Sequence, residues 1–572
     1  MLMKNTINKK RNAFKTTYRI INALYWPFAF LIIILGILSR FQISIVPFST
    51  MDTWGFLKPA LALNKNHQLE RLFGRPIFYP IFLSIILKLF NNLNAISLVQ
   101  HLLGIFGGII LLLTWRRINK LLPPTPGIQI TFDCIGLAML ANYFFNIDMI
   151  MYEHTIISEA IYNFLMICLV SLIVLWFESR KNRNFKGEAW LSISMLFYAV
   201  FLFSFQPRFG LAIIIPITLT TISILSSRQK SLAKILTIVL LACAVLLVLY
   251  IPNKYAARTD LLSKTLTSEI VLGNYAPIVA EQINDDINKS PDLTVRYDKT
   301  LLKEFYLRLK SDIDTTKGVI KLLGYDCGGI TWNGASRWLA ERLDSAPEKI
   351  INFNYYYTIS AILNHPYDFI KRMMLQLSVV YSLDSPVMVS NRLAEAIPYW
   401  EYSKKSIYSP WWFKSNFKYY REVARESKII LLESPLMRKY YVDLEQSINN
   451  LGSNYSPIIG RSIPPSFLSF FHAKPKYILP IFVIFFTLIT IFYYIKVFRP
   501  ITKQLNSYIG IISVTILIQL LMHLSIATAI NLEDHRYIHD HYSFLIFNYY
   551  GCVTLFFISG LSWVHSRKKN II

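Results

Sequence analysis

Apolar runs long enough to cross a bilayer recur near both ends of this 572-residue chain. A helix needs about 20 mostly apolar residues to cross the hydrocarbon core. With 54% hydrophobic residues and a mean hydropathy of +0.39, the sequence predicts an all-α polytopic membrane protein. We expect about ten transmembrane helices, at 20–39, 97–115, 128–148, 155–177, 189–204, 209–225, 233–252, 478–495, 507–530 and 543–563.

The apolar segment Ile77–Phe90 is shorter than these spans, and Pro80 and Lys88 interrupt it. A stretch of this length is typical of an interfacial or re-entrant helix. If it does not cross, the loops and termini of one side carry 22 basic residues against Glu178 and Glu188. Because cytoplasmic loops are enriched in lysine and arginine, both termini are predicted to be cytoplasmic.

The same loops account for most of the formal net charge of +25, so the charge is an orientation signal. No nucleic acid partner is therefore expected. The basic and apolar N-terminal segment lacks a small-residue cleavage site and is interpreted as a retained first helix. We expect a multi-pass protein of the bacterial inner (cell) membrane.

Three regions follow from this topology. Residues 1–252 form an N-terminal transmembrane module whose first outer loop is 40–96. Residues 253–476 are polar and predict an extracytoplasmic domain, mainly α or α+β. Residues 477–572 hold the C-terminal transmembrane helices. Within the polar region, the aromatic block 398–420 is expected either to stack on sugars or to anchor at the membrane interface.

Several ionisable groups fall on the predicted outer face, next to the ends of the spans. Ionisable groups at membrane depth are costly and mark functional sites. A carboxylate there can accept the proton of an attacking hydroxyl, while arginines neutralise a departing phosphate. The candidates are Asp52, Arg75, Tyr79, Glu153, Glu159, Arg208, Arg536 and Tyr537.

The order of these features resembles the GT-C glycosyltransferases, which include protein O-mannosyltransferases and bacterial aminoarabinose transferases of lipid A. An acid follows the first span, and an Arg-Pro-x-x-Tyr-Pro segment precedes the short apolar helix. The resemblance rests on Asp52-Thr53-Trp54, Arg75–Pro80, the stretch 153–159, the Gln-Pro-Arg turn at 206–208 and the pair Arg536-Tyr537.

This resemblance implies a membrane enzyme that transfers a sugar, with inversion, from a polyprenyl-phosphate-linked donor to a lipid, glycan or protein acceptor. Asp52 would be the general base, and Glu153 or Glu159 the second acid. The family's next acid is Thr53 here. No residues are assigned as metal ligands. The resemblance implies no certain cofactor, and a divalent metal is the one candidate.

The resemblance also assigns the donor-binding groups. Three arginines would hold the lipid phosphate, and two tyrosines would line the donor pocket. These residues are Arg75, Arg208, Arg536, Tyr79 and Tyr537.

Other interpretations compete with this one. Asp52 is a fair N-cap for the helix that follows it, and arginines at span ends often extend to lipid headgroups. An O-antigen polymerase or ligase would also combine many spans with outer arginines, but Asp52 would then be dispensable. A transporter or scaffold is less favoured, because the span centres are almost purely apolar.

Overall fold

The computed structural model describes residues 23–42, 44–123, 125–206, 209–226, 261–288, 296–315, 324–381, 396–451, 499–529 and 542–570. The regular structure in these ranges is helical, and their one pairing of extended backbone is an isolated bridge between Phe48 and Thr155. The prediction of an all-α chain is therefore confirmed for the described residues.

Seven of the described helices are long and apolar enough to cross a membrane. These seven helices confirm the prediction of a multi-pass membrane protein. The seven are the first helix (Ala23–Arg40), α4 (Asn94–Asn119), α5 (Pro126–Phe145), α7 (Glu159–Lys181), α8 (Phe185–Phe205), α23 (Arg499–Ala529) and α25 (Tyr542–Asn570).

The remaining three predicted spans are not among these seven. The segment 209–225 forms the short helix η2 (Leu211–Ile213) followed by α9 (Ile214–Ser226), which is shorter than the seven. The predicted spans 233–252 and 478–495 lie outside the described residues.

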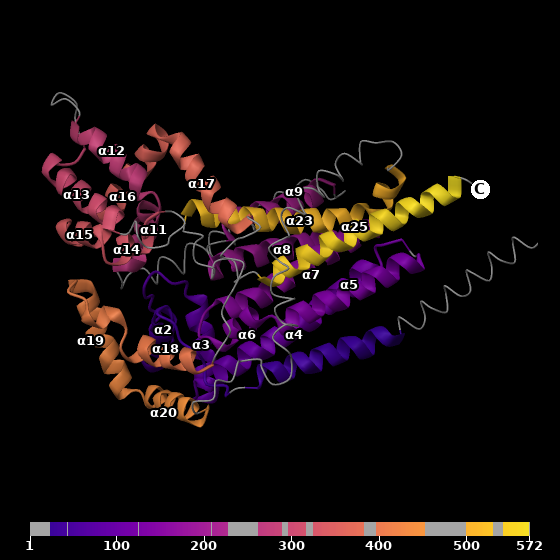
Figure 1. The fold of residues 1–572 in the computed structure, drawn as a ribbon, viewed down its shortest axis with the longest axis horizontal. Helices are drawn as coiled ribbons and strands as arrows, with labels where there is room; N and C mark the ends of the chain where they lie inside the picture. Colours follow the sequence, from indigo (N-terminus) through magenta and orange to yellow (C-terminus); the bar gives the residue numbers. More distant parts are fainter. Residues whose placement is uncertain are drawn as a thin grey trace, which may run out of the picture.

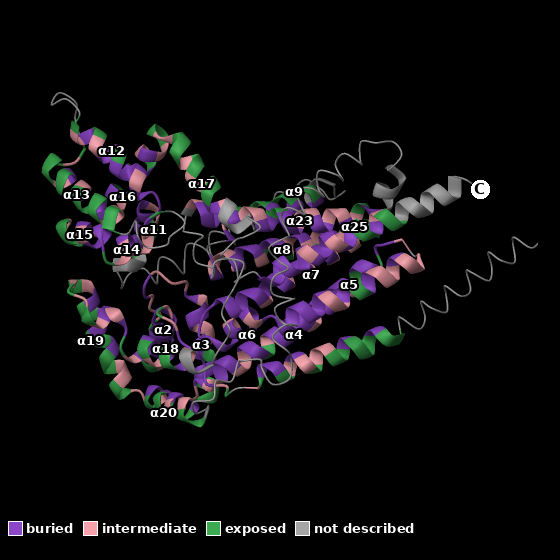
Figure 2. Cartoon of the chain, in the orientation of Figure 1, coloured by how far each residue is buried: buried purple, intermediate pink, exposed green. Residues whose placement is uncertain are grey.

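The long helices form one bundle, in which α4 packs against α5 and α7, and α25 packs against α5 and α23 (Figure 1). Its interior is rich in aromatic side chains: Trp115 stacks on Phe132 at 4.4 Å between ring centroids. Buried residues concentrate between the helices, and the first helix is exposed along much of its length (Figure 2). Its exposed residues include Phe30, consistent with a lipid-facing helix.

Two short helices, α2 (Thr53–Asn66) and α3 (Phe78–Phe90), pack against each other at one end of the bundle, which we call the α2 end. At 1.5 Å per residue, the 13 residues of α3 span roughly 20 Å, less than the roughly 30 Å of a bilayer core. This length agrees with the prediction that Ile77–Phe90 does not cross.

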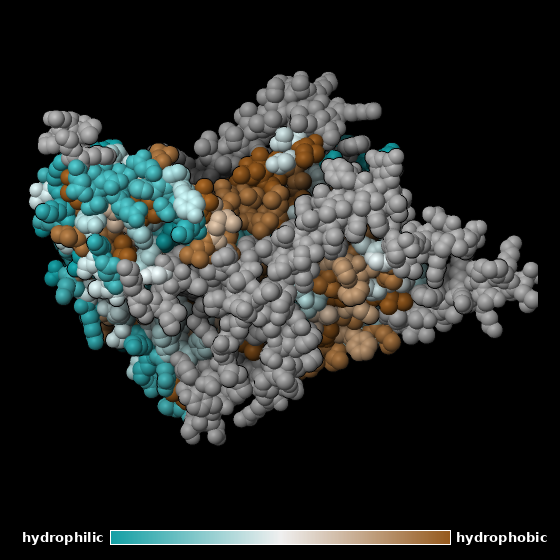
Figure 3. Space-filling view, turned by 45° about the horizontal axis from the view of Figure 1, so that its top comes forward, coloured by the Kyte–Doolittle hydropathy of each residue, from teal (hydrophilic) through white to brown (hydrophobic). Residues whose placement is uncertain are grey.

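The described residues from 261 to 364 form a compact helical group with a core of its own, built from residues such as Ile283, Phe305 and Phe353. Hydrophilic residues gather over this group, and hydrophobic ones over the bundle (Figure 3). Its helices are α11 (Leu261–Asn274), α12 (Ala276–Asn288), α13 (Lys299–Thr315), α14 (Cys327–Trp332), α15 (Ala335–Arg342) and α16 (Pro347–Asn364), and α17 (Pro366–Tyr381) packs next to α16 and α23.

A second helical group covers the loop before α2. It consists of α18 (Ala396–Tyr408), η3 (Trp411–Lys414), α19 (Lys418–Glu433) and α20 (Pro435–Leu451). Trp400 and Trp412 of the aromatic block are buried there, and Trp54 of α2 donates to the Ile407 carbonyl at 3.0 Å. These two tryptophans therefore pack inside the protein, which neither of the two expected roles of the block anticipated.

Candidate functional site

Asp52 stands at the first turn of α2, where threonine hydroxyls hold the backbone. The Thr53 hydroxyl accepts from the Thr50 N–H at 2.9 Å and donates to the Ile156 carbonyl at 3.1 Å. Asp52 occupies the N-cap position, but its side chain makes no capping hydrogen bond. The simple capping role considered for Asp52 therefore does not account for its carboxylate.

That carboxylate forms an ion pair with Arg75, and each side chain is 21% exposed. A tight turn brings Arg75 to this place: Phe73 and Gly74 have positive φ angles of 52° and 65°. Arg71 fixes the turn by donating to the carbonyls of Gly74 and Arg75, both at 2.9 Å. Asp52 and Arg75, which are 23 positions apart in the sequence, thus meet at the α2 end.

The backbone of the Asp52 loop is tied to the segment after α6 (Ile147–His154). Phe48 donates to the His154 carbonyl at 2.8 Å and accepts from the Ile156 N–H at 2.9 Å. The Asp52 loop and the stretch 153–159 are therefore neighbours in the fold, although about 100 residues separate them.

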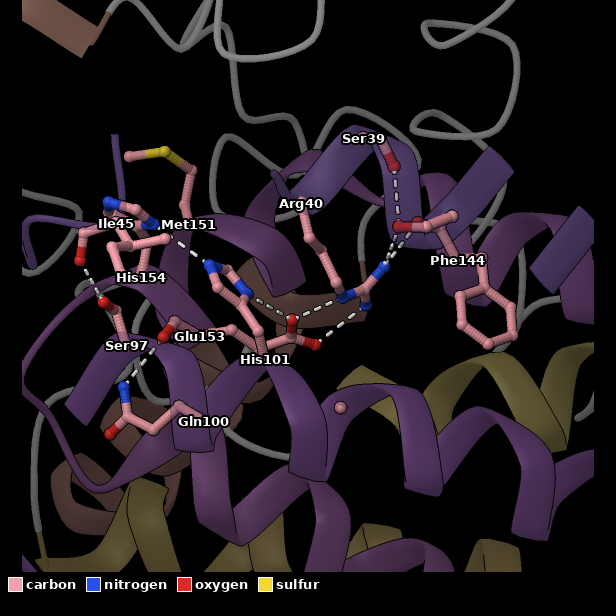
Figure 4. A network of polar contacts seen from close by, with 12 residues as sticks. Ser39, Arg40, Ile45, Ser97, Gln100, His101, Phe144, Met151, Glu153 and His154 are labelled. Atoms are coloured by element: carbon pink, nitrogen blue, oxygen red, sulfur yellow. Dashed lines mark hydrogen bonds and ion pairs between the residues drawn. The ribbon is translucent and has the colours of Figure 1, made fainter. Parts of the chain in front are cut away.

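Glu153, the other predicted acid, lies in a buried network next to this loop (Figure 4). Its carboxylate receives the Arg40 guanidinium in a bidentate pair at 2.6 and 2.9 Å and contacts His101 at 3.0 Å. The chain of contacts continues from His101 to His154 at 3.0 Å and from His154 to the Val46 carbonyl at 2.9 Å. The network thus ends on the loop that carries Asp52.

The charges in this network follow from burial and pairing. Burial alone would raise the pKa of Glu153, but Arg40 and then His101 outweigh it and hold that pKa below its ordinary value. Burial, followed by the nearby His101, lowers the pKa of His154 from 6.5 to about 3. Glu153 is therefore ionised and His154 neutral near pH 7.

Space for the Glu153 carboxylate is made by Gly104 on α4, because a Cβ there would collide with it. Arg40 also donates to the carbonyls of Gly36 and Phe144 at 3.0 and 3.1 Å. The first helix, α4, α5 and α6 thus meet around a single carboxylate.

Tyr79 and Glu159 lie on the other side of the same segment. The Tyr79 hydroxyl donates to Gln100 at 2.7 Å, and the Gln100 amide donates to the carbonyls of Glu153 and Thr155, both at 2.8 Å. Burial and, to a lesser degree, the charge of Glu159 raise the pKa of Tyr79 well above its ordinary value. Tyr79 is therefore a neutral, buried hydrogen-bond donor, and Glu159 lies near enough to influence it.

The Glu159 carboxylate accepts from Ser158 at 3.3 Å, and Ser158 in turn accepts from Gln206 at 2.5 Å. Gln206, from the end of α8, therefore reaches the stretch 153–159. Arg208, Arg536 and Tyr537 lie outside the described residues, so their convergence with Asp52, Arg75 and Glu153 stays a prediction.

A divalent metal does not fit the groups around Asp52 in the described part of the chain. Mg²⁺ and Mn²⁺ sites favour several oxygen ligands, with carboxylates foremost. The Asp52 carboxylate pairs with a guanidinium, the adjacent Thr53 hydroxyl is engaged, and both Glu153 oxygens meet Arg40 or His101. Among the described residues, one group could hold a metal ion: Glu281 of α12, His365 between α16 and α17, and Asp368 of α17.

Sequence reasoning missed Arg40, Gln100 and His101. Each is a polar residue inside or at the end of an apolar span, a position where an ionisable group needs a partner. That signal was present, but the partner of each could not be read without the fold.

The fold and site define a multi-pass α-helical membrane protein with a carboxylate–arginine pair at the α2 end of its bundle. Comparisons with models of protein families, with curated proteins and with solved structures found no match for this chain.

Proposed function

We propose that this protein is a membrane glycosyltransferase of the GT-C kind. It transfers a sugar from a polyprenyl-phosphate-linked donor to the hydroxyl of a lipid, glycan or protein acceptor. The observation that carries the proposal is the partly exposed Asp52–Arg75 ion pair, 21% exposed on each side, at the α2 end of the bundle. A carboxylate beside a guanidinium at the level of lipid headgroups suits this reaction.

In the proposed step, the Asp52 carboxylate takes the proton of the acceptor hydroxyl as its oxygen bonds to the anomeric carbon. The bond from that carbon to the phosphate oxygen breaks, and the polyprenyl phosphate leaves with the electron pair, so the configuration inverts. A guanidinium has five N–H donors, so Arg75 could pair with the phosphate as well as with Asp52.

The other predicted residues that the structure describes take roles that follow from their surroundings, and the resemblance alone assigns the rest. Tyr79 and Glu159 would shape the donor side of the site, and Arg208, Arg536 and Tyr537 would complete the phosphate pocket as the resemblance implies. Glu153, with both oxygens engaged, would stabilise the helices beside the Asp52 loop rather than touch the acceptor.

The proposal includes an extracytoplasmic site, cytoplasmic termini and the bacterial inner membrane. The C-terminal end of α4 and that of α7 carry basic residues, which supports a cytoplasmic position for these ends; Arg117 of α4 pairs with Glu178 of α7. The opposite end of α4 lies on the proposed extracytoplasmic side, where Asn94 contacts Asp443 of α20.

The test is transfer of a radiolabelled sugar from a panel of polyprenyl-phosphate-linked donors by the full-length protein in nanodiscs. We expect Asp52→Asn to lower the rate at least about 100-fold, because general acid–base catalysis contributes this much. The control is Glu433→Gln. Glu433, on α19, forms an exposed ion pair with Lys65 of α2, the helix that Asp52 precedes, and the substitution removes its charge. Transfer at the wild-type rate by a folded Asp52→Asn protein would instead favour a polymerase or ligase.

A further inference from the structure

Three residues with metal-binding side chains meet at the corner where α16 gives way to α17. Glu281 comes from α12, His365 stands between α16 and α17, and Asp368 lies in the first turn of α17. One ligand atom of each lies within 4.8 Å of the other two. Neither the proposed reaction nor the network around Glu153 uses these residues, and the corner lies well away from α2 (Figure 1).

Packing holds the backbone of this corner in place. Asn364, the last residue of α16, donates its amide to the side-chain carbonyl of Gln282 on α12 at 2.7 Å. Phe369 of α17 packs on Tyr275, with 5.3 Å between the ring centroids. The two carboxylates of the cluster are exposed, so they can turn toward a common point without disturbing the core.

His365 faces a carboxylate with each of its ring nitrogens. Nδ1 lies 3.9 Å from an oxygen of Glu281, and Nε2 lies 3.9 Å from an oxygen of Asp285, one turn further along α12. Both distances are too long for hydrogen bonds. With bonds of about 2.0–2.2 Å to one ion, two ligand atoms can lie up to roughly 4.2 Å apart, so Nδ1 and Glu281 are close enough to share an ion. Asp285 then faces the other ring nitrogen, where a carboxylate usually orients a metal-bound histidine.

One imidazole nitrogen and two carboxylate oxygens select a class of metal ion. Imidazole suits Zn²⁺ and its first-row neighbours, whereas Ca²⁺ and Mg²⁺ are bound through oxygen ligands. Zn²⁺ takes three protein ligands of these types together with a water molecule. The charges of the two carboxylates would balance those of a divalent ion.

We propose that Glu281, His365 and Asp368 form a binding site for Zn²⁺. The site joins α12, which belongs to the helical group with its own core, to α17, which also packs against the long apolar helix α23. A bound ion would therefore fasten the helical group to the bundle. The inference concerns metal binding alone, so it does not depend on whether the chain transfers sugars.

The test is Zn²⁺ binding to the full-length protein in nanodiscs, purified without a polyhistidine tag and measured by competition with a chromophoric chelator. We expect saturable binding, and Glu281→Gln/Asp368→Asn should weaken it at least about tenfold. His365→Gln should do the same, because loss of even a residue that orients a metal ligand costs about 10- to 100-fold in affinity. X-ray absorption of the bound Zn²⁺ should show an imidazole ligand that His365→Gln removes.

The matched control is Glu341→Gln/Glu348→Gln, which removes two exposed carboxylates from α15 and α16 of the same helical group. It should keep the wild-type dissociation constant within about twofold. Three results would overturn the proposal: no saturable Zn²⁺ binding, binding by both ligand variants that equals wild type, or displacement of Zn²⁺ by an equal concentration of Mg²⁺. None of these results bears on the transfer assay, because no sugar donor is present.

Discussion

The two arginine–carboxylate pairs at the α2 end differ most in their contact with solvent. Arg40 and Glu153 are 0% and 3% exposed, and both carboxylate oxygens receive the guanidinium. Arg75 and Asp52 are each 21% exposed, and one guanidinium nitrogen reaches one carboxylate oxygen. The same chemical groups thus stand in two different environments within one region of the fold.

This difference separates an acid that holds the structure from one that is open to substrate. A buried ion pair must keep its partners, because an unpaired charge in the interior is strongly unfavourable. A partly solvated pair can exchange partners with a hydroxyl or a phosphate at small cost. We therefore interpret Glu153 as a residue that stabilises the fold, through the helices that meet beside the Asp52 loop.

The largest effect on stability is expected from Glu153→Ala. The substitution leaves Arg40 buried without its carboxylate, and losses of about 3–5 kcal/mol accompany such changes. SDS-induced unfolding of the purified protein in mixed micelles measures the change. The matched control is Glu178→Ala, because its pair with Arg117 is 22% and 49% exposed.

The control should lose less than about 1 kcal/mol, as exposed ion pairs do. Equal losses for the two variants would show that burial does not distinguish these pairs.

A smaller effect is expected from pH through His154. Its pKa falls from 6.5 to about 3 on folding, so the unfolded chain binds a proton below pH 6.5 that the folded chain excludes. The stability from this group is complete above pH 6.5 and is lost as pH falls toward 3, by about 1.4 kcal/mol per unit. His101 and the Val46 carbonyl face this ring.

Unfolding midpoints between pH 7 and pH 5 measure this slope. His154→Gln should reduce it by about one proton relative to the wild-type protein. An unchanged slope in His154→Gln would contradict the assignment of a neutral, buried His154.

The smallest effect on stability, with a clear effect on transfer, is expected from Gly55→Ala. A Cβ at Gly55 would lie 2.7 Å from Cγ of Arg75, so the arginine must move away from Asp52. Alanine favours a helix over glycine by about 1 kcal/mol, which offsets the local strain. We expect transfer to fall at least about tenfold with an unfolding change below about 1 kcal/mol. Full transfer activity would show that the position of Arg75 is unimportant.

Much of the fold could be predicted from sequence because hydrophobic length and loop charge are strong local signals. The spans that became α4, α5, α7 and α23 follow from apolar runs alone, and the short α3 follows from Pro80 and Lys88. The aromatic block could not be interpreted in the same way. Trp400 packs on the loop before α2 and Trp412 on Trp54 of α2, each more than 340 residues earlier in the chain, and no local pattern encodes such contacts.

The site was predictable in part for the same reason. Asp52 and Arg75 stand close together in sequence, in a loop whose ends are fixed by a span and a helix, so their proximity could be inferred. The role of Glu153 could not, because it depends on Arg40 and His101 from two other helices. Sequence shows which residues are ionisable, whereas their burial and partners emerge only from packing.

The central claim is that Asp52 serves the reaction and Glu153 the structure. Its most direct test measures SDS-induced unfolding and sugar transfer for Asp52→Asn and Glu153→Gln side by side. The account predicts that Asp52→Asn unfolds within about 1 kcal/mol of wild type while transfer falls at least about 100-fold. It predicts that Glu153→Gln is clearly less stable, yet its folded fraction transfers at close to the wild-type rate. A stable but inactive Glu153→Gln protein, together with an active Asp52→Asn protein, would contradict it.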